Sequence, residues 1–155
     1  MKAILALAIL VAVSAAAVGA VQAHCEVPCG IYDDEMRIKM IQEHITTIEK
    51  AMKQITALSA ETPANYNQIV RWTLNKEKHA EELQNIVQQY FMTQRIKPAH
   101  GDDGELAKSY LDQLAALHMM LVHAMKAKQT TDLGQIEALR SLTEDFNKLY
   151  FAGKK

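Results

Sequence analysis

The stretch that decides the fold is residues 34–59, DEMRIKMIQEHITTIEKAMKQITALS. Its apolar side chains recur at alternating intervals of three and four residues, at Ile38, Ile41, Ile45, Ile48, Met52 and Ile55. This spacing places them along one face of an α-helix, because a helix turns once about every 3.6 residues. Asp33 or Asp34 is suited to cap the first turn. The pattern therefore predicts an amphipathic helix that ends at about Ser59.

A second helix is predicted to begin at Thr62–Pro63, because proline is tolerated at the first helical position, and to extend to about Met92. Its apolar positions are Tyr66, Ile69, Val70, Leu74, Leu83, Ile86, Val87 and Tyr90. A loop with Pro98, Gly101 and Gly104 separates it from a third predicted helix over residues 103–128. Thr131–Asp132 is then suited to cap a fourth helix.

The connections between these four segments are mostly short, which favours an antiparallel four-helix bundle over residues 33–155. The predicted fold class is all-α. Only 6 glycines and 3 prolines occur in 155 residues, too few for a turn-rich β-sandwich or barrel. The formal net charge of −1 indicates no basic surface for nucleic acid or for an anionic membrane. We therefore expect no nucleic-acid partner.

Residues 1–23 differ from the rest of the chain. Lys2 provides a short positive start, residues 4–18 are almost entirely Ala, Val, Leu and Ile, and Val21-Gln22-Ala23 is typical of a cleavage site. The arrangement predicts a secretory signal peptide that is cleaved after Ala23. A retained membrane anchor is the alternative, because the apolar run approaches the roughly 20 residues of a membrane span. We expect an exported protein, in the periplasm or an equivalent extracytoplasmic compartment, with no membrane contact after cleavage.

Cleavage would expose residues 24–32, HCEVPCGIY, which carry the donors of a metal site. A metal bound to the new α-amine of His24, the amide nitrogen of Cys25 and the Cys25 thiolate closes two adjacent chelate rings. Cys29 can supply a fourth donor, because Pro28 and Gly30 allow the chain to turn back sharply. The imidazole of His24 can approach from the axial direction.

Two nitrogens and two sulfurs in one plane favour Ni(II) or Cu(II) over tetrahedral zinc. The bound metal would keep both sulfurs as thiolates, even in an oxidising compartment. An anionic amide and two thiolates stabilise a higher oxidation state, so this ligand set indicates one-electron redox chemistry. The alternative is a disulfide between Cys25 and Cys29 that closes a tight loop in an exported protein.

The nine residues 24–32 resemble the nickel hook of the nickel-containing superoxide dismutases, His-Cys-x-x-Pro-Cys-Gly-x-Tyr at a newly made N-terminus, and match every specified position. The resemblance implies an antioxidant enzyme that converts superoxide to oxygen and hydrogen peroxide by Ni(III)/Ni(II) cycling. It also implies a four-helix subunit, one nickel ion per subunit and assembly as a homohexamer.

Residue by residue, the resemblance makes His24, Cys25 and Cys29 the metal ligands. It implies a cis peptide bond at Pro28. Tyr32 and Tyr90 become the catalytic phenols, which line the approach of superoxide and hold small anions near the metal without binding it. Tyr90 lies in Gln89-Tyr90-Phe91, where the family's second helix carries a Tyr-Phe pair.

The sequence departs from the family at the third hook position, where Asp is common and this chain has Glu26, and at two positions in the helices. Some members orient the axial imidazole with a glutamate of the first helix and an arginine of the second. Counted from the hook, these places fall on Met40 and His79, and Glu43 or Glu77 could substitute.

Two other hypotheses stay open on the sequence alone. An exported four-helix protein could sequester nickel or copper through the same hook without turnover, or a structural bundle could hold its two cysteines as a disulfide. Only the enzyme needs tyrosines beside the metal, and only the metal hypotheses need a free amine at His24.

The other polar residues of the helices are expected to be structural. His44, His100 and His123 show no paired spacing of metal ligands, which favours surface or hydrogen-bonded core positions. The run KEKHAEE, residues 76–82, is predicted to be a partly solvated face, from which His79 could support the metal site.

Overall fold

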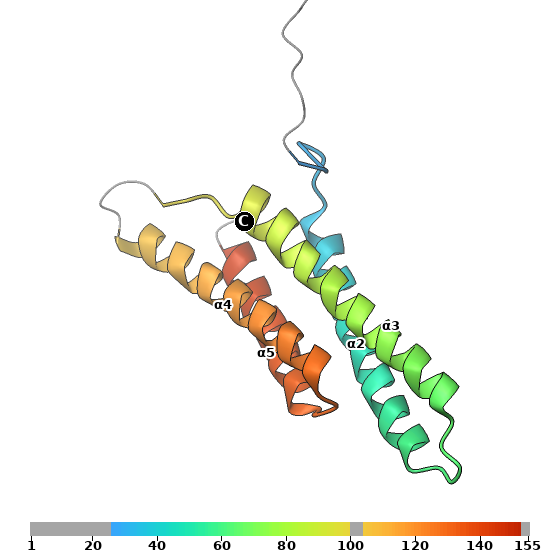
Figure 1. Ribbon diagram of the computed structural model, residues 1–155. Coiled ribbons are helices and arrows are strands. Elements are labelled where there is room, and N and C mark those ends of the chain that lie inside the picture. Colours follow the sequence, from blue (N-terminus) through green and yellow to red (C-terminus); the bar gives the residue numbers. More distant parts are fainter. Residues whose placement is uncertain (1–25, 100–103, 153–155) are drawn as a thin grey trace, which may run out of the picture.

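The computed structural model describes residues 26–99 and 104–152, and that part of the chain contains helices and no strand. The helices are α2 (Asp34–Ser59), α3 (Tyr66–Asn85), α4 (Gly104–Gln129) and α5 (Gly134–Ala152). A π-helix, η1 (Ile86–Arg95), continues α3. Two hairpins, α2 with α3 and α4 with α5, lie side by side (Figure 1). The prediction of an all-α four-helix bundle is confirmed.

The apolar face of α2 forms the centre of the core, as its spacing predicts. Ile41, Ile45, Ile48 and Met52 are completely buried. They belong to one cluster with buried side chains from all the other helices, including Leu83, Val87, Phe91, Leu117, Met120, Leu139 and Phe146. Burying each such side chain contributes about 1.5–3 kcal/mol, so this cluster is the main force that holds the two hairpins together.

Side chains cap the helices close to the predicted places, with one exception. Asp33 caps α2 by accepting a hydrogen bond of 2.9 Å from the Met36 amide, and Asp132 accepts one of the same length from the Gly134 amide at the start of α5. The start predicted at Thr62–Pro63 is wrong. Asn65 caps α3 instead, because its side chain satisfies the first turn at least as well as threonine, and the cis Thr62–Pro63 bond lies in the loop.

Lys76 is an exception to the prediction that residues 76–82 form a partly solvated face. Its side chain is buried, and its Nζ atom donates hydrogen bonds to the carbonyl oxygens of Ala127 (2.8 Å), Lys128 and Thr130 (3.0 Å). These carbonyls lie where α4 ends, and a helix C-terminus attracts a cation. Burial lowers the pKa of Lys76 from its ordinary value. The lysine therefore fixes the α4–α5 turn against α3.

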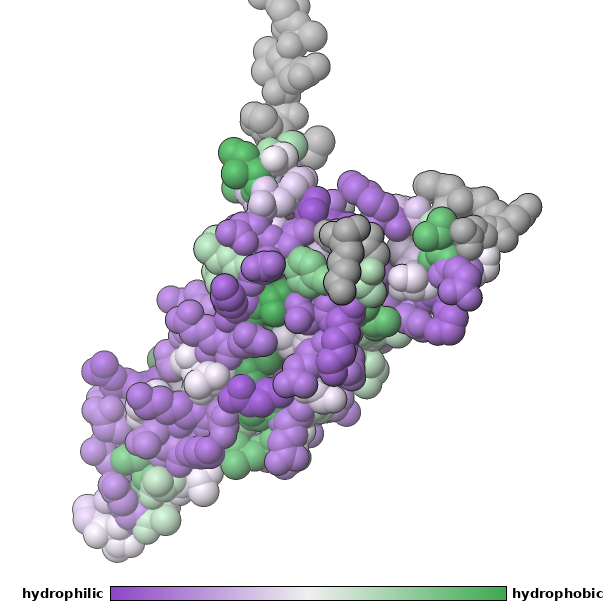
Figure 2. Space-filling view, turned by 180° about the vertical axis from the view of Figure 1, so that it is seen from behind, coloured by the Kyte–Doolittle hydropathy of each residue, from purple (hydrophilic) through white to green (hydrophobic). Residues whose placement is uncertain are grey.

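The first half of α3 projects beyond the α4–α5 turn (Figure 1). Tyr66, Val70 and Leu74, predicted on the apolar face, are therefore exposed, at 75%, 56% and 64%. Figure 2 shows a mostly hydrophilic opposite face, with apolar side chains at the end where residues 26–31 leave the bundle. An apolar stripe of α3 is thus left uncovered by this chain.

None of the described helices combines the length and the apolar character that a bilayer crossing requires. The predicted signal peptide, residues 1–23, lies outside the described residues.

Candidate metal centre

The described part of the hook, residues 26–32, forms a tight turn just before α2. The Val27–Pro28 peptide bond is cis, as the resemblance implied, and the Ile31 amide donates a 3.0 Å hydrogen bond to the Pro28 carbonyl. Gly30 has a φ of 81°, a conformation that other residues adopt only with strain. Cys29 lies in this turn as a free, exposed thiol. Its sulfur is therefore accessible to a metal.

His24 and Cys25 lie outside the described residues, so of the three predicted ligands only Cys29 has a described position. The donor that is described fits the metal implied by the resemblance, because an exposed thiolate is a soft ligand and Ni(II) accepts such ligands. Val27 and Ile31 flank it with side chains that are 83% and 82% exposed.

The structure brings the two predicted phenols together directly below this turn. The rings of Tyr32 and Tyr90 meet edge to face, with their centroids 5.9 Å apart. Tyr32 is 38% exposed, whereas Tyr90 is almost completely buried. The side chain of Tyr32 is therefore accessible to a small molecule near the hook, whereas Tyr90 is buried against it.

A network of hydrogen bonds around Asp34, which the sequence did not predict, holds Tyr90 in place. Tyr90 donates a 2.8 Å hydrogen bond to Oδ1 of Asp34, and Tyr150 donates one of 2.8 Å to Oδ2. Arg95 binds both oxygens of the same carboxylate at 2.8 Å. Because Asp34, Arg95 and Tyr150 belong to α2, η1 and α5, one carboxylate joins three elements below the hook.

The network sets the protonation of its phenols. Burial, and then the hydrogen bond to Asp34, raises the pKa of Tyr90 and of Tyr150 well above the ordinary value. The hydrogen bond to Asp34 likewise raises the pKa of Arg95. Both phenols therefore stay protonated and remain donors to the carboxylate.

The π-helix η1 brings Tyr90 and Arg95 to the hook. Side-chain hydrogen bonds reach back five residues, from Thr93 to the Gln88 carbonyl and from Gln94 to the Gln89 carbonyl, both at 2.8 Å. Such wide turns redirect side chains and occur often at functional sites. The Gln94 amide also lies 3.4 Å from the Val27 carbonyl, so η1 contacts the hook itself.

Two arginines place positive charge against the phenols. The guanidinium carbon of Arg95 lies 4.1 Å from the ring centroid of Tyr32, and that of Arg37 lies 4.9 Å from that of Tyr90. Arg95 is paired with Asp34, but Arg37 forms no ion pair with any described residue, and its buried Nε has no hydrogen-bond partner. Arg37 thus places a cation without an ion-pair partner among the described residues against the ring of Tyr90.

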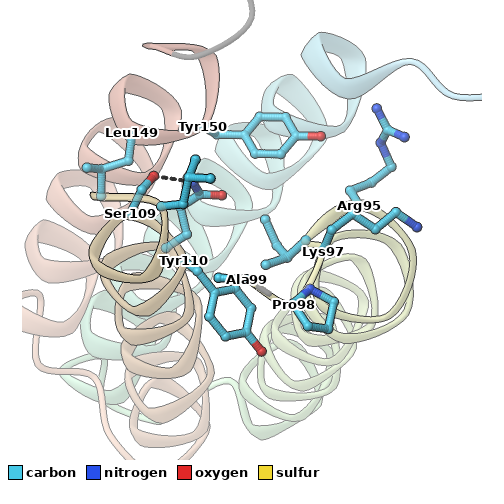
Figure 3. A pocket seen from close by; sticks show the side chains of 11 residues that line it. Arg95, Lys97, Pro98, Ala99, Ser109, Tyr110, Leu149 and Tyr150 are labelled. Carbon is cyan, nitrogen blue, oxygen red and sulfur yellow. Dashed lines mark hydrogen bonds between the residues drawn. The ribbon is translucent and has the colours of Figure 1, made fainter. Parts of the chain in front are cut away.

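A cavity of about 490 Å³ adjoins the network on the side of α4. Figure 3 shows Tyr150 and Tyr110 around it, with Arg95 and Lys97 extending from one wall. No acidic residue is among the described residues that line it.

The two helix positions where the sequence departs from the family, Met40 and His79, do not come together. Met40 is partly buried, and its sulfur lies 3.7 Å from a terminal nitrogen of Arg37. His79 instead pairs with His44, farther along the bundle. Of the possible substitutes, Glu43 is exposed and Glu77 lies 3.9 Å from Lys76.

The described chain is thus an all-helical bundle that carries an exposed thiol, a soft ligand for a metal, on a tight turn next to two phenols. Residues 19–154 match the family of nickel-containing superoxide dismutases. The chain belongs to this family: it is a nickel superoxide dismutase whose cofactor is nickel and whose substrate is superoxide. No curated protein and no solved structure matches the chain.

Proposed function

We propose that His24, Cys25 and Cys29 hold one nickel ion per subunit, and that superoxide reaches it past Tyr32. The observation that carries this proposal is the position of the free Cys29 thiol, on a turn whose next aromatic residue is the exposed Tyr32 above Tyr90. A protein that only sequesters metal has no need for phenols at this place.

Nickel, when bound, supplies the one-electron exchange, between Ni(III) and Ni(II), by which two superoxide ions and two protons become oxygen and hydrogen peroxide. The protein must then admit a small anion, hold it and supply protons. The residues around the turn have groups suited to each task.

Tyr32 is the group proposed to hold the anion. Its ring is fixed from one side by the guanidinium of Arg95 and from below by Tyr90, while its surface is 38% exposed. A phenol held in this way can donate a hydrogen bond to superoxide or peroxide without becoming a metal ligand.

Tyr90 is proposed to act as a positioning residue for Tyr32. Its hydroxyl hydrogen is already donated to Asp34, and the ring is buried. Tyr90 can therefore form the apolar floor of the approach, and Tyr32 is the phenol with a hydroxyl close to solvent.

Arg37 is proposed to raise the rate at which superoxide arrives. Uncompensated positive charge near a site increases the encounter rate of a small anion, and the effect weakens as salt screens it. The chain as a whole has a formal net charge of −1, so any attraction must come from local charges such as this one.

The deciding experiment tests the free amine of His24. We would prepare the mature protein with one extra glycine before His24, in a sequence that a protease can cleave directly before His24. The extra residue converts the amine into an amide, so nickel content and dismutase activity should both be lost, and cleavage of the same sample should restore both.

Cys29→Ser serves as the second arm, because it removes a sulfur while leaving the N-terminus intact. It should also abolish stoichiometric nickel. Full nickel and full activity in the uncleaved, extended protein would refute the proposed ligand set, and a Cys25–Cys29 disulfide in the active protein would do the same.

We also propose export and self-association. Residues 1–23 support cleavage and export by their composition. The exposed stripe of Tyr66, Val70 and Leu74 on α3 supports assembly of several subunits, consistent with a homohexamer, because apolar side chains gain stability when a second subunit covers them. Mass spectrometry of the secreted protein and sedimentation of the intact assembly test the two proposals.

A further inference from the structure

Three potential metal ligands converge between α2 and α3, away from the hook. They are His44 of α2 and His79 and Glu82 of α3. The two Nδ1 atoms lie 2.9 Å apart, and each lies 3.6 Å from Oε2 of Glu82. Residues up to 38 positions apart in the sequence therefore bring two imidazole nitrogens and one carboxylate oxygen to one place.

We propose that His44, His79 and Glu82 form a second metal site, which takes a divalent transition ion of the zinc class. Zinc binds imidazole nitrogen and carboxylate oxygen at about 2.0–2.2 Å, so two ligand atoms of a tetrahedral site lie about 3.3 Å apart. The three separations found, 2.9, 3.6 and 3.6 Å, bracket that value. Small side-chain movements would bring all three atoms into the coordination sphere.

The surroundings suit a site with three protein ligands. The side chain of His44 is 11% exposed, that of His79 is 23% exposed and that of Glu82 is 39% exposed. The ion would therefore be held from the core side, and a water molecule could complete the tetrahedron from solvent. Two histidines and one glutamate with an open fourth position form a known zinc ligand set.

The chemistry of the two histidines also favours a cation between them. Two Nδ1 atoms that face each other can share only one proton, whereas a metal ion can accept a lone pair from each of them. Lys78 lies 3.6 Å from Oε1 of Glu82, so Oε2 remains directed at the histidines.

This site is separate from the hook within the chain. Ten residues of helix, with a rise of about 15 Å, lie between Asp34 at the base of the hook and His44. None of the described hook residues contributes to the cluster. The proposed ion would instead join α2 to α3 and stabilise this hairpin.

The test begins with the nickel-loaded enzyme. After equilibration with zinc and removal of the excess, elemental analysis should find one zinc per chain in addition to the nickel. The same measurement on the mature Cys25→Ser/Cys29→Ser protein should still find one zinc, because both hook sulfurs are absent. Cobalt(II) in this double variant should give the visible bands of a tetrahedral site without a sulfur-to-metal charge-transfer band.

Three variants locate the ion. His79→Ala and Glu82→Gln should each weaken zinc binding at least tenfold in titration calorimetry and remove the zinc-dependent rise in melting temperature. Glu82→Gln is the safeguard against misfolding, because it keeps the shape of a side chain at the surface. His118→Ala is the matched control, since His118 is exposed on α4, and it should bind zinc like the parent.

Two results would overturn the proposal. The first is the absence of stoichiometric zinc from the double cysteine variant, which would mean that the histidines share only a hydrogen bond. The second is zinc binding that survives in both His79→Ala and Glu82→Gln, which would place the ion elsewhere. Neither result would bear on the nickel hook, whose ligands are different residues.

Discussion

Removal of the Asp34 carboxylate is the sharpest test of the network beneath the hook. Asp34→Ala deletes an acceptor of four hydrogen bonds, two from phenols and two from Arg95. It also leaves the guanidinium of Arg95, which is 22% exposed, without the carboxylate that compensates its charge.

The expected loss follows from these contacts. Removal of one member of a buried ion pair costs about 3–5 kcal/mol. The lower half of that range applies here, because the Asp34 and Arg95 side chains keep 13% and 22% of their surface exposed. We therefore expect a loss of about 3–4 kcal/mol in the free energy of unfolding. For a domain of this size that corresponds to a fall of about 10–15 °C in melting temperature.

Urea unfolding followed by far-ultraviolet circular dichroism would measure the loss, with parent and variant in the same metal state. The neighbouring Asp33→Ala is the matched control, because the Asp33 side chain caps α2 and its removal should cost about 1 kcal/mol. Combined with Tyr150→Phe, Asp34→Ala should show non-additive losses, since the two residues share a hydrogen bond. Equal losses for the two aspartates, or strict additivity with Tyr150→Phe, would refute the idea that Asp34 joins three elements.

Four further predictions rest on single contacts. Lys76→Met should lower the free energy of unfolding by about 2–3 kcal/mol, because three carbonyl oxygens lose a charged donor. In the same urea titration, Lys148→Met should change it by less than about 0.5 kcal/mol, because Lys148 is exposed. Arg37→Met should lower kcat/KM several-fold at low ionic strength, and the difference should shrink as salt is added; an unchanged rate at low salt would remove the steering role. Tyr32→Phe should keep its nickel but change turnover or anion inhibition, measured by metal analysis and pulse radiolysis; loss of nickel would show that its role is structural. The raised pKa of Tyr150 stabilises the protein at any pH below about 10. This contribution is lost as the pH rises further, because the unfolded chain then releases a proton that the folded chain keeps. The fall in the free energy of unfolding above pH 10 should therefore be shallower in Tyr150→Phe, by up to about 1.4 kcal/mol per pH unit.

The turn of the hook could be predicted because the residues that form it are neighbours in the chain. Cys29, the cis bond at Pro28 and the positive φ of Gly30 all fall within one short segment. For the same reason the helices and most of their caps could be predicted. The start of α3 could not, because Thr62 and Asn65 are both good capping residues and the loop geometry decides between them.

The network around Asp34 was missed although each of its residues is visible in the sequence. The pair Asp33–Asp34 contained the only signal, since one aspartate suffices to cap a helix and the second is then available for another partner. Nothing in the spacing indicates that Arg95 and Tyr150, 61 and 116 residues away, bind that second carboxylate.

The sequence by itself determined the all-α class, the apolar face of α2 and the thiol-bearing turn. These depend on helical periodicity and on residues that lie close together along the chain, which short-range geometry controls. Only the tertiary structure decided that Lys76 is buried at the end of α4, that Asp34 joins three elements, and that His44 meets His79 and Glu82. Each of these depends on how two helices are rotated and shifted against each other, and that alignment results from the packing of the whole core, which no single segment encodes.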